Sequence, residues 1–217
     1  MSVYTARRVM MVDTQVRPSV VTKFPIIAAM LAVKREAYVP RARREAAYVG
    51  ENFDLGGGRV MLEARTLAKL LDALDVQPGD TVLDLGCGLG YSAAVIARLS
   101  QAVVAVEADE ALASEAQRSL AEEGVDNAVV VVSPLDQGDA RHGPYDVIVV
   151  EGGVEVMPEA ILAQLKDGGR IGAVFMEGAL GIVRIGHKSG GRVTWRFAFN
   201  AAAPVLPGFA QARAFVL

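Results

Sequence analysis

The stretch Thr81-Val-Leu-Asp-Leu-Gly-Cys-Gly-Leu-Gly90 joins a short apolar run to a glycine-rich loop, and an apolar helical pattern follows it. A strand, a glycine loop and a helix in this order are typical of open α/β sheets, which bind nucleotide-like ligands at the carboxyl end of the first strand. Glycines in the loop let the backbone approach such a ligand closely. The alternative is a tight strand-to-helix turn that binds nothing.

Two details of the loop argue against a dinucleotide ligand. The spacing is G-x-G-x-G, and Tyr91 stands where a G-x-G-x-x-G fingerprint has its last glycine. Asp84 precedes the first glycine, where its negative charge would repel a pyrophosphate and attract a cation. S-adenosylmethionine carries an ammonium and a sulfonium but no phosphate. The loop therefore predicts a site for this methyl donor and its product S-adenosylhomocysteine, and disfavours a nicotinamide-dependent oxidoreductase.

The chain downstream of the loop alternates short apolar runs with helical patterns, which predicts a parallel sheet covered on both faces. Because Val129 to Val132 is a continuous β-branched run, we expect it to form a buried central strand. A hairpin turn at 188–191 would close the sheet with antiparallel strands. The predicted strands are 81–85, 102–106, 128–132, 145–150, 171–175, 182–187 and 193–199, and the predicted helices are 91–99, 109–123 and 156–166.

The N-terminal part has a helical pattern of apolar residues from Thr5 to about Tyr48, whose methionines and valines we interpret as core. We predict one domain over 1–217, with a helical annex at 1–75 and the binding core at 76–217. The short basic cluster Arg41, Arg43 and Arg44 is interpreted as a solvated helix face.

Composition excludes several classes of protein. The net charge is −3 and no block of lysine and arginine is present, so we expect no nucleic acid partner. No apolar run approaches the roughly 18 residues of a membrane span, so no membrane partner is expected. The single cysteine, Cys87, excludes an internal disulfide and favours a reducing cytoplasm. His142 and His187 lie far apart in sequence, so neither a metal site nor a catalytic triad is predicted.

Acidic residues follow two further predicted strands. Glu107 ends the second strand, where its carboxylate could accept hydrogen bonds from both hydroxyls of a ribose, although a solvent-facing charge is the alternative. We expect Asp109 to cap the next helix. Glu151 ends the fourth strand and either lines the methyl-donor pocket or is an ordinary turn carboxylate.

The chain resembles the protein-L-isoaspartate O-methyltransferases over nearly its whole length. The resemblance includes 11–17, 32–40 and 47–48 near the N-terminus, the loop region 82–95, and the later segments 145–149, 164–165 and 168–169. It implies a class I, Rossmann-like methyltransferase fold: a doubly wound, mainly parallel, seven-stranded sheet. The implied reaction is methyl transfer from S-adenosylmethionine to an isoaspartyl or D-aspartyl carboxylate, which begins protein repair. The implied donor-binding residues are Asp84, Leu85, Gly86, Cys87, Gly88, Gly90, Tyr91, Ser92, Glu107, Ala108, Leu135 and Glu151.

The sequence departs from this family in the loop expected to hold the methyl acceptor. Leu62 stands at the position of a hydroxyl residue and Ala64 at that of a proline, so Val60, Leu62 and Glu63 are the candidate substrate-loop residues and no catalytic residue is assigned. The acidic residue that would hold adenine is also absent, because Ser133-Pro-Leu135 replaces a Gly-Asp-Gly turn. The expected acceptor is a protein or peptide. The alternatives are another acceptor, including a small molecule, and a non-catalytic, donor-binding regulatory protein; the oligomeric state is not predicted.

Overall fold

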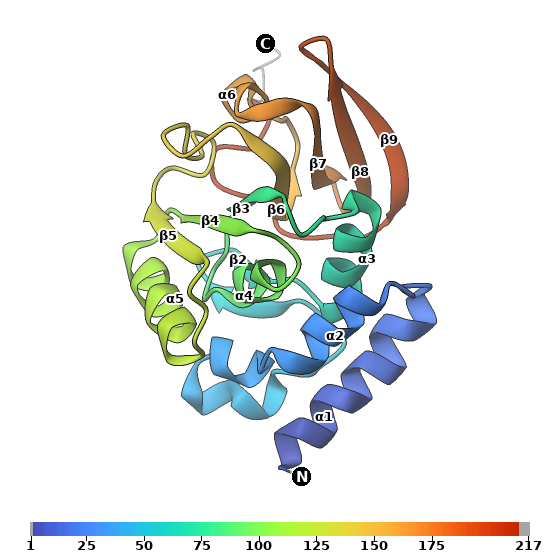
Figure 1. The fold of residues 1–217 in the computed structure, drawn as a ribbon, viewed down its shortest axis with the longest axis vertical. Helices are drawn as coiled ribbons and strands as arrows, with labels where there is room; N and C mark the ends of the chain where they lie inside the picture. Colours follow the sequence, from blue (N-terminus) through green and yellow to red (C-terminus); the bar gives the residue numbers. More distant parts are fainter. Residues whose placement is uncertain (1, 213–217) are drawn as a thin grey trace, which may run out of the picture.

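The computed structural model describes residues 2–212, which form a seven-stranded sheet, flanking helices and a separate two-stranded hairpin (Figure 1). The strand order is β5-β4-β3-β6-β7-β8-β9, with parallel pairing from β5 to β7 and antiparallel pairing from β7 to β9. The predicted fold class is therefore confirmed. The strands are β3 (Thr81–Leu85), β4 (Ala102–Glu107), β5 (Ala128–Val132), β6 (Tyr145–Val154), β7 (Leu165–Glu177), β8 (Leu180–Ser189) and β9 (Arg192–Asn200).

Both faces of the sheet are buried, because successive side chains of its central strands point into different cores. In β3, Val82 belongs to a large cluster with α3 (Ala64–Leu74), α4 (Tyr91–Ala97), α5 (Glu110–Glu122) and the N-terminal helices. Leu83 and Leu85 belong to a second cluster with α6 (Glu159–Ala163) and with Leu206 and Phe209 of the C-terminal segment. This period-2 alternation makes the central strands apolar throughout.

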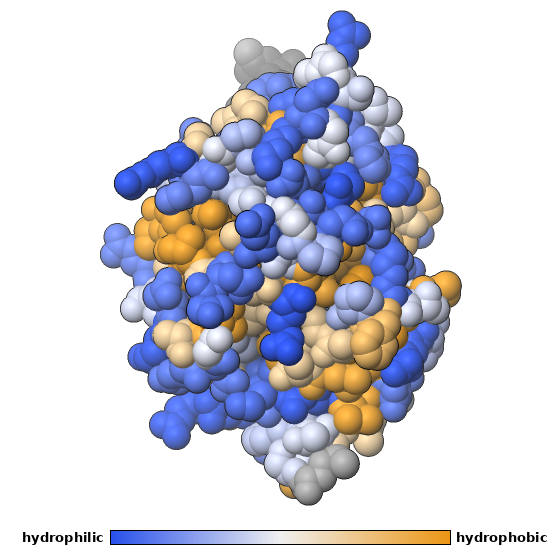
Figure 2. All heavy atoms as spheres, in the orientation of Figure 1, coloured by the Kyte–Doolittle hydropathy of each residue, from blue (hydrophilic) through white to orange (hydrophobic). Residues whose placement is uncertain are grey.

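The prediction of a buried central strand at 129–132 is wrong. β5 is the edge strand beside β4, and Val129 and Val132 are 44% and 53% exposed. Figure 2 shows apolar side chains at the surface over this edge. A β-branched run favours an extended strand, but it does not distinguish an edge from the centre of a sheet, since that depends on partners far away in sequence.

Most element boundaries lie close to the predicted ones. Asp109 caps α5 as expected, accepting hydrogen bonds from the backbone nitrogens of Ala111 (2.9 Å) and Leu112 (3.0 Å). The predicted helix at 156–166 is shorter, because α6 begins after Pro158 and Leu165 already pairs with Tyr145 in the sheet. β6 continues past the predicted end at residue 150 and therefore includes Glu151.

The N-terminal region contains mostly helical elements: α1 (Val3–Met11), η1 (Val12–Val16), η2 (Arg17–Ser19), α2 (Phe24–Ala32), η3 (Arg35–Tyr38) and η4 (Arg41–Ala46). Its apolar residues are buried as predicted at Met11, Val12 and Met30, whereas Val9 and Met10 are exposed. Figure 2 shows further apolar side chains over α1 and α2. Within residues 2–212, none of the helices has both the length and the apolar character needed to cross a membrane.

The predicted helical annex also contains an antiparallel hairpin, which the helical interpretation did not anticipate. It consists of β1 (Phe53–Gly56) and β2 (Arg59–Met61), with Phe53 opposite Met61. Gly56, Gly57 and Gly58 form the turn with φ values of 88°, 59° and 76°, a region that favours glycine. The three glycines thus reverse the chain between β1 and β2.

Candidate functional site

The glycine loop follows β3 at the carboxyl edge of the parallel strands. Gly86, Gly88 and Gly90 have φ values of 82°, 55° and 93°, so the loop backbone needs glycine at all three positions. The backbone nitrogen of Gly86 donates to Val106 O on β4 (2.8 Å), and the backbone nitrogen of Ala94 donates to Gly90 O (3.0 Å). The loop is therefore fixed between two strands and the start of α4.

Three buried carboxylates come from neighbouring strands at this edge. Asp84 on β3 and Glu107 on β4 have no solvent exposure, and Glu151 on β6 is 4% exposed. Asp84 Oδ2 accepts a hydrogen bond from Ser92 Oγ (2.7 Å) at the start of α4. Asp84 Oδ1 and Glu151 Oε1 have no hydrogen-bond partner within the part of the chain that the structure describes. Buried anionic oxygens without donors are costly, so this arrangement suits a cationic or hydrogen-bond-donating ligand.

Burial controls the protonation of this site. Burial raises the pKa of Asp84 to about 7; the hydrogen bond from Ser92 opposes this shift and the charge of Glu107 adds to it. Burial and the charge of Asp84 likewise hold the pKa of Glu151 well above its usual range. The pKa of the Cys87 thiol is also raised, chiefly by burial, so this cysteine is not activated as a nucleophile and serves instead as a small buried residue of the loop.

Glu107 has the most complete set of partners of the three carboxylates. Its Oε2 accepts from the backbone nitrogen of Gly88 (2.9 Å) and from Arg59 Nη2 (2.8 Å), and its Oε1 accepts from the backbone nitrogens of Ala108 (2.9 Å) and Asp109 (3.3 Å). Glu107 is therefore not the solvent-facing charge considered as the alternative.

Arg59 was not foreseen from the sequence. It lies on β2, is 5% exposed, and forms an ion pair with Glu107 from 48 residues away. Among the described residues, none accepts a hydrogen bond from its Nε or Nη1. The only sequence signal was an arginine directly after the three-glycine turn, where the chain re-enters a strand.

The other predicted donor-binding residues divide into two groups. Tyr91 and Ser92 lie at the start of α4, and Ala108 follows Glu107 at the surface, so the structure gathers them around the loop. Leu85 and Leu135 are buried in the second apolar cluster. The loop after β5 reaches the site through its backbone, because the backbone nitrogen of Ser133 donates to Glu107 O (3.2 Å).

The candidate substrate loop is held by its backbone. Leu62 is 1% exposed, so its side chain is packed, and its carbonyl oxygen accepts a hydrogen bond from Arg35 Nη2 (2.8 Å). Glu63 precedes α3, and its Oε1 accepts from Thr66 Oγ1 (2.7 Å). Val60 is half-buried on β2. The side chains of the loop thus pack or bond locally.

Arg35 is a second residue that sequence reasoning missed. It is 1% exposed, donates through Nε to Ala47 O (2.7 Å) as well as to Leu62 O, and its Cζ lies 4.6 Å from the centre of the Tyr91 ring. Burial lowers the pKa of its guanidinium. This one side chain connects the N-terminal segment, the candidate substrate loop and α4.

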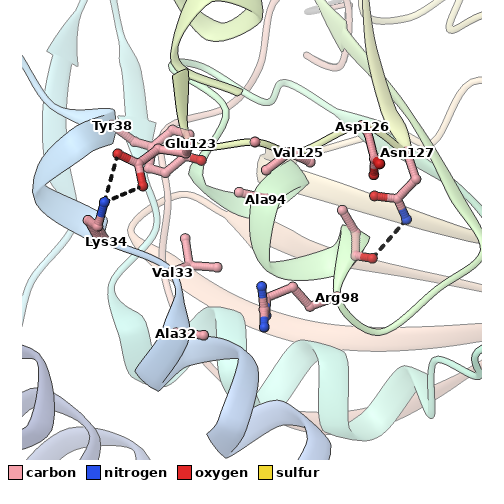
Figure 3. A pocket seen from close by; sticks show the side chains of 12 residues that line it. Ala32, Val33, Lys34, Tyr38, Ala94, Arg98, Glu123, Val125, Asp126 and Asn127 are labelled. Atoms are coloured by element: carbon pink, nitrogen blue, oxygen red, sulfur yellow. Dashed lines mark hydrogen bonds and ion pairs between the residues drawn. The ribbon is translucent and has the colours of Figure 1, made fainter. Parts of the chain in front are cut away.

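A cavity of about 450 Å³ lies elsewhere in the protein. Figure 3 shows Lys34 and Glu123, which form an ion pair, on one side of this cavity, Asn127 on the other side, and Arg98 between them. Asn127 precedes β5 and Arg98 follows α4, so this cavity lies at the amino-terminal edge of the parallel strands. Ligands of open α/β sheets bind at the carboxyl edge, and we therefore separate this cavity from the glycine-loop site. Across residues 2–212, no group of three histidine, cysteine, aspartate or glutamate residues is arranged to hold a metal ion.

Comparison with known proteins agrees with this arrangement. The sequence profile of protein-L-isoaspartate (D-aspartate) O-methyltransferase matches residues 6–193. A protein-L-isoaspartate O-methyltransferase 2 from Pelobacter propionicus is 36% identical over 165 residues, which cover 76% of this chain and 73% of that protein. A protein-L-isoaspartate O-methyltransferase from Methylorubrum extorquens is 36% identical over 169 residues, covering 76% of this chain and 72% of that protein.

Solved structures show the same fold. A protein-L-isoaspartate O-methyltransferase superposes with a TM-score of 0.80 at 24% identity, covering 93% of this chain and 66% of that one. A Plasmodium falciparum protein described by the same activity, in complex with S-adenosyl-L-homocysteine, superposes with a TM-score of 0.78 at 17% identity, covering 95% of this chain and 99% of that one. From the profile match and the curated relatives, this chain belongs to the protein-L-isoaspartate (D-aspartate) O-methyltransferase family.

Proposed function

We propose that this protein transfers the methyl group of S-adenosylmethionine to the free carboxylate of an isoaspartyl residue in a protein or peptide. The observation that carries the proposal is the buried carboxyl site around the glycine loop, in which oxygens of Asp84 and Glu151 have no hydrogen-bond partner among residues 2–212. Such oxygens fit the ammonium group of the donor. The family membership supplies the acceptor class.

The donor-binding residues fall into groups with different proposed roles. Asp84 and Glu151 bind the ammonium group, because their unpartnered oxygens are buried where a cation would neutralise them. Glu107 accepts hydrogen bonds from the ribose hydroxyls, as an acidic side chain at the end of the second strand does in related sheets. Gly86, Gly88 and Gly90 shape the backbone of the site, together with the neighbouring Leu85, Cys87, Tyr91, Ser92 and Ala108.

The adenine ring is the part of the donor without a charged partner. Leu135 supplies apolar contact from the loop after β5, which the hydrogen bond between Ser133 and Glu107 holds beside the ribose site. Backbone groups of this loop can then satisfy the adenine nitrogens in place of an acidic side chain.

No residue of the protein needs to form a covalent bond in this reaction. When bound, the donor supplies a methyl carbon on a positively charged sulfur, and an ionised carboxylate can take that carbon without a general base. The residues of the chain therefore contribute alignment and exclusion of water. Leu62 is consistent with this requirement, because its carbonyl is fixed by Arg35 and its side chain keeps water away from the loop.

We further propose a cytoplasmic location, since the single cysteine is buried and forms no disulfide. The acceptor would then be an intracellular protein that carries isoaspartyl damage.

The test of the proposed function is methyl transfer from labelled S-adenosylmethionine to a matched pair of peptides. One peptide contains an isoaspartyl residue, and the control contains ordinary aspartate at the same position. We expect base-labile label in the isoaspartyl peptide only, because its free carboxylate is attached directly to Cα, whereas the free carboxylate of ordinary aspartate lies one methylene group further away on the side chain. Equal labelling of both peptides, or no labelling although S-adenosylhomocysteine binds, would contradict the proposed acceptor.

A further inference from the structure

The β1–β2 hairpin lies directly over the glycine loop. A Cβ atom added to Gly86 would lie 2.9 Å from Arg59 Nη2, and one added to Gly88 would lie 2.6 Å from Leu55 Cδ1. Arg59 and Leu55 therefore fill the space that faces the two glycines. The same space is where a ligand would make its close approach to the loop backbone.

Arg59 also places a positive charge beside the buried carboxyl groups of this site. Its guanidinium bonds to Glu107, and its positive charge opposes the raised pKa values of Asp84 and Glu151. A buried carboxylate cluster without a cation would be strongly unfavourable, so Arg59 supplies the neutralisation that the donor would otherwise bring. Nε and Nη1 of Arg59 have no acceptor in residues 2–212, so this part of the buried guanidinium forms no hydrogen bond there.

Within residues 2–212, the hairpin pairs with no strand of the seven-stranded sheet, so no ladder hydrogen bond would have to break for it to shift. Its turn, Gly56 to Gly58, is exposed, and a Cβ added at any of these glycines would meet nothing within 4 Å. The hairpin is held to the body of the protein through side chains, because Phe53 and Met61 pack in the large apolar cluster. Arg43 contacts β1 from outside the hairpin. The Cζ of Arg43 lies 4.2 Å from the centre of the Phe53 ring, and Arg43 Nη1 donates a hydrogen bond to Asp54 O (2.6 Å).

We propose that the β1–β2 hairpin is a gate on the methyl-donor site, in which Arg59 and Leu55 occupy the place of the donor until it binds. This inference rests on the proposed function, because it assigns the regulation of the same site. Donor binding breaks the ion pair between Arg59 and Glu107 and frees Glu107 for the ribose hydroxyls. Since β2 continues into Leu62, withdrawal of the hairpin also displaces the candidate substrate loop, which couples donor binding to the acceptor side.

If the hairpin acts as a gate, removal of the side chains that occupy the donor site should strengthen donor binding. Arg59→Ala should bind S-adenosylhomocysteine about tenfold more tightly than the unaltered protein, because the affinity is no longer reduced by the fraction of closed molecules. Leu55→Ala, which opens space over Gly88 and changes no charge, should bind about threefold more tightly by the same reasoning. Isothermal titration calorimetry measures both affinities. Arg118→Ala is the matched control, because Arg118 is exposed on α5 and forms ion pairs with Glu115 and Glu122 of the same helix.

A second measurement uses the unaltered protein and does not depend on whether a variant folds. Hydrogen–deuterium exchange should increase at residues 53–61 and decrease at 84–90 when S-adenosylhomocysteine is added. Increased protection of 53–61, or unchanged or weaker binding by folded Arg59→Ala and Leu55→Ala, would overturn the gate and make Arg59 a ligand of the donor or a structural residue. Absence of binding by the unaltered protein and by both variants would overturn the proposed function as well.

Discussion

Arg35→Ala is expected to lower the free energy of unfolding by about 3 kcal/mol, a large effect for one substitution. The variant removes the buried donor to the carbonyl oxygens of Ala47 and Leu62 and leaves both without that partner. It also removes the cation that stacks on Tyr91. Urea denaturation measures the change, and the slope with denaturant shows whether the transition is still two-state.

The control for this prediction is Arg65→Ala, whose side chain is 56% exposed and pairs with Glu63 at the surface. That change should stay within about 0.5 kcal/mol. Arg35→Lys should recover only part of the loss, because an ammonium lacks the planar fork that reaches two carbonyls at once. A loss below about 1 kcal/mol for Arg35→Ala would contradict the role assigned to this side chain.

Asp84→Asn is expected to weaken S-adenosylhomocysteine binding by about 10- to 100-fold, the usual range for a lost hydrogen bond to a charged group. The asparagine keeps the shape of the side chain and can still bond to Ser92, but it lacks the negative charge that attracts the ammonium. The free energy of unfolding should not fall, because the variant removes a buried carboxylate whose pKa is raised by burial. Calorimetry and denaturation together separate the two effects.

The pH dependence of S-adenosylhomocysteine affinity is a second test of the role of Asp84. The pKa of Asp84 is raised to about 7, and only the ionised carboxylate attracts the ammonium. Affinity should therefore rise as pH increases through this value and fall below it, and Asp84→Asn should flatten that rise. Asp126→Asn, the same change at an exposed position on the opposite edge of the sheet, is the control and should alter neither affinity nor its pH dependence. Equal affinities for the unaltered protein and Asp84→Asn would contradict the donor role of Asp84.

The sequence predicted the features that depend on local pattern. Gly86, Gly88 and Gly90 marked a strand-to-helix loop because their backbone conformations exclude other residues, and the structure gives all three positive φ values. Glu107 could be placed beside the loop because consecutive parallel strands end at the same edge. The cap at Asp109 was likewise local, since it depends on hydrogen bonds within three residues.

The features that the sequence did not predict depend on long-range contacts. Val129 to Val132 indicated a strand correctly, but the edge position of β5 depends on which strands pair with it. Arg59 and Arg35 are buried through partners 48 and 27 residues away, and their local sequence resembles that of exposed basic residues. Leu62 stands where the family has a hydroxyl residue, and its role toward the acceptor stays a prediction. The hydrogen bond from Arg35 to the Leu62 carbonyl involves the backbone, so sequence comparison of side chains does not reveal it.

A crystal structure of this protein with S-adenosylhomocysteine tests the central claim most directly. We predict the ammonium group beside Asp84 and Glu151, the ribose hydroxyls on Glu107, and Arg59 withdrawn from the glycine loop. A ligand bound elsewhere, such as in the cavity between Lys34 and Asn127, or bound with Arg59 still paired to Glu107, would contradict this account.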